Sequence, residues 1–326
     1  MPTTVALARC TTYDDAAIDA ALQRLIAPLG GWSRFIRSGA RVLLKPNLIT
    51  MAPVDEHATT HPALVAGVLR AVLACGGRPS IGDDPAFGSI DSVARSCGIA
   101  EVAARYRAPL VELDSPQRLQ TTSTLTPRGL VVDRTAVDTD VLINLPKLKA
   151  HNQLLLTAAV KNLYGCVPGK RKMWRHVQAR HDVDRFADML VANARALRPE
   201  LSIVDGVIAM EERGPRHGRA KALGVLAAGE DCVAVDRVVC EVIGCDPTRY
   251  PILQAALRAG FGAASLADIR LAGDPLERLR DPSFKLPLRL EDISFELGRA
   301  ARSVLRQFWI TRVVERGRAQ TLRYGR

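Results

Sequence analysis

The stretch RVLLKPNLITMAPVDEHATTHPALVAGVLRAVLACGGRPSIGDD, residues 41–84, decides the fold class. Its first apolar run, residues 41–44, is typical of a buried strand. Residues 62–74 place apolar side chains at helical spacing and begin with a proline, which favours a first helical turn. Residues 79–81 form a second short apolar run. A strand, a helix and a second strand in this order predict two parallel strands joined by a helical crossover.

The same alternation continues on both sides of this stretch. Before it, residues 5–8 predict a strand and residues 15–27 a helix; after it, residues 110–140 are rich in Thr, Val and Leu between turn residues and predict antiparallel strands. Beyond residue 140 we predict strands at 141–145, 201–204 and 222–227, and helices at 154–163, 183–197, 232–243 and 251–259. The prediction is an α/β fold, a mainly parallel sheet flanked by helices with a β-rich inserted segment. The predicted regions are 1–109, an N-terminal α/β region; 110–140, the β-rich segment; 141–275, a second α/β region with the basic ligand-binding segment; and 276–326, a basic amphipathic tail.

Composition excludes several classes of protein. With 326 residues, 48% hydrophobic and 24% charged, the chain is neither mainly disordered nor collagen-like. It contains no apolar run of about 18 to 20 residues, so we expect no membrane span and a cytoplasmic location. The seven cysteines stand at least five positions apart, which predicts neither a disulfide framework nor a cysteine-based metal site. We therefore expect no bound metal.

Charge is distributed unevenly along the chain. Residues 298–326 contain eight arginines and one glutamate, which accounts for most of the net charge of +11. Residues 141–181 contain eight Lys or Arg and no Asp or Glu, whereas a segment of this length would ordinarily contain about five acids. The acid-free segment predicts that an anion is bound there.

Polar residues follow three of the predicted elements. Parallel sheets bind ligands beyond the carboxyl ends of their strands and at helix N-termini. We therefore predict ligand contacts from Lys45, Asn47 and Thr60, and proton transfer by His61 or Asp83. Thr60 is also a candidate cap for the helix that begins at Pro62. Taken singly, each of these motifs is equally typical of ordinary loop chemistry.

The acid-free segment supplies the largest group of candidates. The run Asn144-Leu-Pro-Lys-Leu-Lys-Ala-His151 carries a predicted strand into alternating lysines, which face one side if the chain is extended. Lys161 falls in an otherwise apolar run, where a lysine is unfavourable unless it is paired or reaches water. We predict ligand contacts from Asn144, Lys147, Lys149, Asn162, Gly169 and Lys170, and catalytic roles for His151 and Lys161.

Acidic candidates follow the strand at 201–204. Asp205 stands at a strand end as a ligand-binding candidate and Glu211 follows it as a catalytic one, while Asp236 is equally well explained by the dipole of the helix that contains it. No Gly-x-x-x-x-Gly-Lys-Ser/Thr and no Gly-x-Gly-x-x-Gly occurs, so a standard nucleotide-binding loop is not predicted.

Several of these motifs in order resemble a known family. Leu44-Lys-Pro-Asn-Leu48, Thr59-Thr-His-Pro62, the string from Asn144 to Lys172, Val204-Asp-Gly206 and Met210-Glu211 are similar to the family catalogued as domain of unknown function 362, over about residues 40 to 250. The resemblance implies a probable site and no particular reaction. Many relatives carry a ferredoxin-like iron–sulfur module, which this sequence lacks. A weaker similarity, to the N-terminal lobe of the nickel-pincer lactate racemases, implies a carboxylate or phosphate ligand.

The leading hypothesis is an enzyme that binds an anionic small molecule and catalyses proton transfer, in an isomerisation, racemisation or lyase reaction. The alternatives are an iron–sulfur-linked redox accessory protein, which makes an oxidoreductase role a further option, and a polyanion- or nucleic-acid-binding protein. Few aromatics, 5% of the chain, make nucleic acid the weaker expectation. No cofactor is indicated. Residues 295–313 predict a basic amphipathic helix that docks on protein, with a homodimer through the tail as one possibility.

Overall fold

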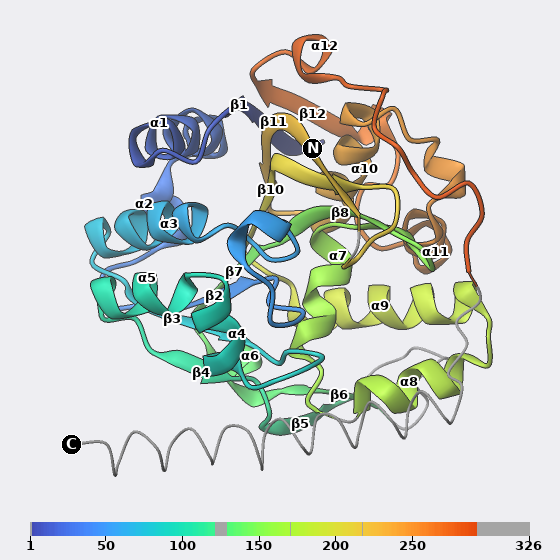
Figure 1. Ribbon diagram of the computed structural model, residues 1–326, viewed down its shortest axis with the longest axis horizontal. Coiled ribbons are helices and arrows are strands. Elements are labelled where there is room, and N and C mark those ends of the chain that lie inside the picture. Colours follow the sequence, from blue (N-terminus) through green and yellow to red (C-terminus); the bar gives the residue numbers. More distant parts are fainter. Residues whose placement is uncertain (1, 121–128, 170, 217, 292–326) are drawn as a thin grey trace.

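The protein is described by a computed structural model over residues 2–120, 129–169, 171–216 and 218–291. Its centre is a ten-stranded sheet in the order β12-β1-β11-β10-β7-β2-β3-β4, to which β8 adds beside β10 and β9 beside β8 (Figure 1). Strands β5 and β6 form a separate two-stranded sheet. The strands are β1 (Thr3–Arg9), β2 (Arg41–Pro46), β3 (Arg78–Asp83), β4 (Leu110–Glu112), β5 (Pro116–Leu119), β6 (Leu130–Asp133), β7 (Val141–Leu145), β8 (Lys147–His151), β9 (Leu155–Thr157), β10 (Leu201–Glu211), β11 (Arg219–Gly229) and β12 (Ile269–Gly273).

Helices connect most of these strands. They are α1 (Asp15–Ile26), α2 (Trp32–Phe35), α3 (Pro62–Ala74), α4 (Ile90–Ser96), α5 (Ile99–Tyr106), α6 (Arg134–Asp138), α7 (Ala159–Asn162), α8 (Arg171–Ala179), α9 (Val183–Leu197), α10 (Cys232–Val242), α11 (Pro251–Ala259) and α12 (Leu276–Leu279). Short 3₁₀ helices lie at Ala27–Leu29, Val54–Glu56, Leu163–Cys166, Pro247–Arg249 and Leu266–Asp268.

The sheet is mixed but mainly parallel, which confirms the predicted α/β fold. Strand β2 runs parallel to both β3 and β7, β7 runs parallel to β10, and β3 runs parallel to β4. Strand β11 is antiparallel to its two neighbours, β10 and β1. The carboxyl ends of β2, β3 and β7 therefore meet at one edge, where the predicted ligand-binding residues lie.

Two apolar cores cover the two faces of the sheet. Alternate residues of each strand enter opposite cores: Leu43 and Val204 face one, Leu44 and Ile203 face the other. One core is completed by α7, α9, α10 and α11, and the other by α1, α3, α4 and α5, on opposite sides of the sheet in Figure 1. Strands buried on both faces explain why these segments are nearly continuous apolar runs.

The segment 110–140 is less of an antiparallel unit than its composition predicts. Strand β4 joins the main sheet as a parallel edge strand next to β3. In the part of this segment that the structure describes, only β5 and β6 pair antiparallel, with Pro116 opposite Asp133, and the short helix α6 follows them. Strands from both sides of the segment belong to one sheet, and the division of the chain into four regions stays a prediction.

The predicted helix at 154–163 is wrong in its first half. Residues Leu155–Thr157 form β9, which turns back antiparallel on β8 with Lys149 opposite Thr157. Leu155 has a φ of +67°, a left-handed conformation that no α-helix contains. Only Ala159–Asn162 is α-helical, followed by the 3₁₀ turn Leu163–Cys166. The apolar run misleads because a buried hairpin strand and a buried helix have the same composition.

Two sequence predictions fall on residues outside the described ranges. The basic helix predicted at 295–313 and the ligand-binding role of Lys170 both lie there. In the described ranges, the helices are all too short or too polar to cross a membrane.

Candidate functional site

Lys45 and Asp83 form a buried ion pair at the ends of β2 and β3. The Lys45 Nζ lies 2.8 Å from Asp83 Oδ1, and both side chains are almost fully buried. The lysine also donates to the carbonyl of Pro46, and the carboxylate accepts from the backbone N–H groups of Leu48 and Asp84. A buried charge is stable only when it is paired and hydrogen-bonded, so these contacts fix the pair in place.

The backbone of Gly165 lies directly against this pair. A Cβ at that position would come within 2.1 Å of Asp83 Oδ1 and 2.5 Å of Lys45 Nζ. The 3₁₀ turn Leu163–Cys166 therefore passes closer to the two charges than any side chain would allow. Sequence reasoning did not select Gly165, although the glycine in Lys-Asn-Leu-Tyr-Gly was the available signal.

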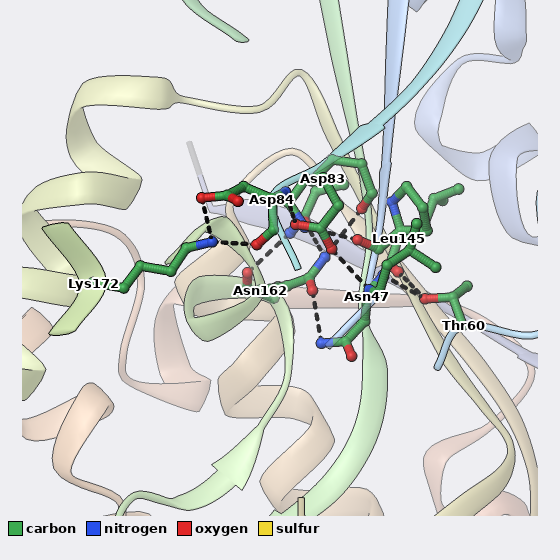
Figure 2. A network of polar contacts seen from close by, with 12 residues as sticks. Asn47, Thr60, Asp83, Asp84, Leu145, Asn162 and Lys172 are labelled. Carbon is green, nitrogen blue, oxygen red and sulfur yellow. Dashed lines mark hydrogen bonds and ion pairs between the residues drawn. The ribbon is translucent and has the colours of Figure 1, made fainter. Parts of the chain in front are cut away.

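Three asparagine amides join the ends of β2, β7 and α7. Asn162 Nδ2 donates to Asn144 Oδ1 at 2.8 Å and to the carbonyl of Lys45 at 3.0 Å. Asn162 Oδ1 accepts from Asn47 Nδ2 at 2.9 Å, a contact visible in Figure 2. All three side chains are buried. Predicted independently as ligand contacts, they use much of their hydrogen-bonding capacity on one another and hold these elements together.

Thr60 is part of the same junction but does not cap α3. Its hydroxyl accepts from the N–H of Asn47 at 2.8 Å and donates to the carbonyl of Leu145 at 2.6 Å (Figure 2). The cap of α3 is His61, whose Nδ1 accepts from the N–H of Ala63 at 3.2 Å. Thr60 is one residue too early in the chain for the capping role predicted for it, and it links β2 to β7 instead.

A second buried ion pair joins β8 to β10. Lys147 Nζ lies 3.0 Å from Asp205 Oδ2, and neither side chain is exposed. Burial opposes the ionisation of Asp205, but the charge of Lys147 and hydrogen bonds from His61 N and Tyr13 OH lower its pKa. These contacts favour the ionised carboxylate of Asp205, whereas burial lowers the pKa of Lys147 despite its contact with that carboxylate.

Tyr13 and His61 cover this pair. The two rings stack with centroids 3.5 Å apart and an interplanar angle of 8°. The Tyr13 hydroxyl donates to Asp205 Oδ1 at 2.7 Å and accepts from Lys147 Nζ at 2.8 Å. Burial lowers the pKa of His61 to about 4, so its imidazole is neutral at pH 7. With Nδ1 accepting, the hydrogen is assigned to Nε2, which makes His61 a donor. Tyr13 lies in the loop after β1 and has no motif that marks it in the sequence.

Lys149 is buried without a carboxylate partner among the described residues. Its Nζ donates to Asn47 Oδ1 at 3.0 Å and to the carbonyl of Ala58 at 2.6 Å, which are both neutral acceptors. Burial, and then the charges of Lys161 and Lys147, hold its pKa well below the usual value for lysine. An isolated buried ammonium is unfavourable, and this one has a further positive group beside it.

Lys161 is that further group. It lies on α7, partly exposed, and no described carboxylate is at ion-pair distance from it. Burial, and then the charge of Lys172, lowers its pKa to about 8. A lysine that titrates near neutrality can act as a base as well as bind an anion.

The residues after Gly165 are attached to the site through Asp84. The Lys172 Nζ lies 2.9 Å from Asp84 Oδ2, and the N–H of Gly169 also donates to that carboxylate (Figure 2). Gly169, which has a φ of +53°, thus contacts a protein carboxylate through its backbone. Asp84 and Lys172 were not among the predicted site residues; Asp84 followed Asp83 in a loop, and nothing local distinguished the two.

Two predicted catalytic residues have other contacts. His151 is buried, and its Nδ1 accepts from the N–H groups of Gln153 and Leu154. Burial, and then the charges of Lys161 and Lys149, hold its pKa well below the usual value. Glu211 lies at the far end of β10, where it accepts from the N–H of Lys285 and pairs with Arg219 at 3.1 Å. Its neighbour Met210 lies opposite Lys149 in the pairing of β10 with β8, but the described contacts of the Glu211 carboxylate are with Arg219 and Lys285 and not with a site lysine.

Asp236 supports the site from α10. Its carboxylate accepts from the N–H groups of Ala159 and Val160, at 2.6 and 3.3 Å, and from the hydroxyl of Tyr250. Burial raises its pKa to about 7 despite these bonds. It caps the first turn of α7 and so positions Lys161 and Asn162, a role more specific than the helix-dipole interpretation.

In the described ranges, no group of three or more His, Cys, Asp or Glu side chains is placed to hold a metal ion. All seven cysteines are free thiols. For Cys166, which lies beside Gly165, burial raises the pKa to about 12, so this thiol is not an activated nucleophile.

Comparison with known proteins places this site in a family. Residues 42–241 match the family described as "Domain of unknown function (DUF362)". The chain belongs to this family. The resemblance inferred from the sequence motifs is thereby confirmed, and the site lysines and asparagines of this DUF362 protein all lie inside the matched residues.

Two individual proteins are also similar. The thylakoid-associated protein sll1697 of Synechocystis sp. is 40% identical over 315 residues, which are 97% of each chain. The lactate racemase apoprotein from Thermoanaerobacterium thermosaccharolyticum is 10% identical, with a TM-score of 0.47 over 72% of this chain and 55% of that one. The chain thus spans about half the length of that racemase.

Proposed function

We propose that this DUF362 protein is an enzyme that binds an anionic small molecule, a carboxylate or a phosphate, and catalyses proton transfer on it. One observation carries the proposal: Lys149 and Lys161 are neighbouring amines without a carboxylate partner among the described residues, whereas Lys45, Lys147 and Lys172 each have one. An anion that binds beside such amines supplies the missing counter-ion and stabilises their protonated forms.

The proton-transfer part of the proposal rests on Lys161 and on His61, which lies beside the Lys147–Asp205 pair. Lys161, with a pKa of about 8, exists partly as a free amine at the pH of most cells and can remove a proton. A carbon next to a carboxylate loses a proton more readily when that carboxylate is held by cations. The neutral imidazole of His61 supplies a hydrogen-bond donor. Isomerisation, racemisation and elimination all begin with such a step.

Ligand-dependent thermal unfolding tests the binding part. Phosphorylated and carboxylated metabolites should raise the melting temperature of the wild-type protein. Lys149→Met and Lys161→Met should abolish the increase. Lys285→Met is the matched control, since it removes an exposed lysine whose ion pair with Glu212 lies away from the site. No increase with any metabolite, or a full increase in both site variants, would overturn the proposal.

Exchange with solvent tests the chemistry. A metabolite that stabilises the protein is incubated with it in D₂O, and loss of a C–H signal is followed by NMR. We expect exchange catalysed by the wild type and by Lys285→Met but not by Lys161→Met. Binding without exchange would reduce the proposal to a binding protein.

Location and partners complete the proposal. We infer a cytoplasmic protein whose partner is a small molecule rather than nucleic acid, with a homodimer through the tail as the possible assembly. The Synechocystis relative is named as thylakoid-associated, so fractionation of cells into cytoplasm and membranes is a direct test of the proposed location. Recovery of the full chain in a membrane fraction that resists washing with high salt would contradict it.

A further inference from the structure

We propose that the ligand of this site is a dianion, either a tetrahedral oxyanion or a dicarboxylate, whose two negative charges are balanced by Lys149 and Lys161. This inference rests on the proposed function and specifies the class of ligand for the same site.

The charges of the site indicate how many negative charges the ligand carries. Among the described residues, five lysine amines interact here, and three of them are paired with Asp83, Asp205 and Asp84 at 2.8, 3.0 and 2.9 Å. The two that remain, Lys149 and Lys161, interact with each other as like charges. When both amines are protonated, a monoanion would leave one of the two positive charges without a partner, which is the unfavourable state described above. A dianion leaves none.

The surroundings of the two amines identify no other counter-ion among the described residues. Lys149 faces Lys45 on β2, Asp83 on β3 and Lys147 on its own strand. Of these neighbours only Asp83 is acidic, and it lies 2.8 Å from the Nζ of Lys45. Lys161 faces Lys172 of α8, and it also acts on His151 and His176, both of which have lowered pKa values.

The arrangement also separates the roles of the two lysines. Lys149 is fully buried and bonded to Asn47 Oδ1 and Ala58 O, whereas Lys161 is partly exposed on α7. Lys161 is therefore the amine that contacts the ligand. Lys149 does not contact the ligand but attracts it through its charge, because the electrostatic interaction is stronger in the protein interior than in water.

Proton uptake is the measurable consequence. Burial and neighbouring cations lower the pKa of both amines in the free protein. A dianion beside the two amines offsets the effect of the neighbouring cations, so the pKa values of the amines rise and protons are bound together with the ligand. At pH 8 about half of the Lys161 amines are unprotonated without ligand, so Lys161 takes up at most about half a proton on binding, and Lys149 adds to this to the extent that it is unprotonated in the free protein.

Isothermal titration calorimetry of the full chain at pH 8 tests this. The probes are sulfate, malonate and acetate, all fully ionised at this pH, at constant ionic strength. Each is titrated in two buffers of different ionisation enthalpy, which reports the protons taken up. We expect one site per chain, at least about tenfold tighter binding of sulfate or malonate than of acetate, and the proton uptake given above. Whichever dianion binds more tightly identifies the geometry.

Two substitutions of Lys161 distinguish charge from titration. Lys161→Met should weaken binding of the dianion at least about tenfold. Lys161→Arg keeps the positive charge but cannot lose its proton, so it should retain binding and take up fewer protons than the wild type. Lys285→Met should behave as the wild type.

The outcomes separate this inference from the proposed function. Acetate binding as tightly as both dianions, or dianion binding without proton uptake, would overturn the dianion while leaving an anion-binding enzyme. Absence of binding by every anion, together with no thermal shift from any metabolite, would overturn the proposed function itself.

Discussion

Replacing Gly165 by alanine should destabilise the protein through the Lys45–Asp83 ion pair. The added Cβ would stand 2.1 Å from Asp83 Oδ1 and 2.5 Å from Lys45 Nζ, well inside any real contact, so the pair must move by about 1 Å or separate. Both partners are held elsewhere, Asp83 by two backbone N–H groups and Lys45 by the carbonyl of Pro46. Separating a buried ion pair costs about 3 to 5 kcal/mol.

Gly82→Ala is the matched control for this substitution. Its Cβ would meet Leu43 Cδ1 at 2.9 Å and Leu113 Cδ2 at 3.0 Å, so only apolar atoms need to shift. Overpacking of that kind costs about 1 to 3 kcal/mol. Neither glycine has a positive φ, so backbone strain does not separate the two variants. Urea unfolding followed by circular dichroism measures both free energies. A loss below about 1 kcal/mol for Gly165→Ala, or a loss equal to that of the control, would refute the reasoning.

Three further predictions concern titrating groups. Lys161 has a pKa of about 8 in the folded state and 10.5 in the unfolded state. The unfolded state therefore binds more protons between these pH values, and the unfolding free energy of the wild type should rise with pH over this range, by at most about 3 kcal/mol. Lys161→Met should lack that rise. Asp236, raised to about 7, binds a proton in the folded state that the unfolded state releases above pH 3.8, so wild-type stability should fall from pH 4 to 7, and Asp236→Asn should flatten the fall. Cys166, with a pKa of about 12, should resist iodoacetamide at pH 8 in the native protein while the partly exposed Cys75 reacts, as mass spectrometry would show; equal labelling would contradict its burial.

The elements that the sequence predicts to the residue are those with strong end signals. Helices α3 and α11 begin at Pro62 and Pro251, and α9 follows Asp182, whose side chain accepts from two N–H groups of the first turn. These signals are local, so they are visible without the tertiary structure. The segment 154–163 has no such signal at its start, and its conformation depends on the pairing of β9 with β8. Although β8 and β9 are close in sequence, the apolar composition of the segment does not show whether it pairs back on β8 or forms a helix.

The site was predictable where it depends on the sheet and not where it depends on loops. Lys45, Asp83 and Asn144 meet because the carboxyl ends of parallel strands share an edge. Glu211 illustrates the limit. Strand β10 runs for 11 residues, far beyond the four predicted, and the carboxylate of Glu211 at its end contacts Arg219 and the N–H of Lys285. Tyr13 was not predicted, although it belongs to the site. It lies in the loop after β1 and contacts Asp205, which is 192 positions away in the sequence.

The acid-free segment explains why the site has an excess of positive charge. Residues 141–181 supply Lys147, Lys149, Lys161 and Lys172 but none of their counter-ions. The carboxylates come from outside it: Asp84 at the end of β3 pairs with Lys172, and Asp205 on β10 pairs with Lys147. Asp84 directly follows β3, and Asp205 lies within β10, opposite Lys147 of β8. The two strands between β10 and β3 in the sheet are β7, which ends in Asn144 and Leu145, and β2, which ends in Lys45 and Pro46. Among the described residues, Lys149 and Lys161 therefore have no carboxylate partner at ion-pair distance, and Lys149 donates to an amide oxygen and a backbone carbonyl instead.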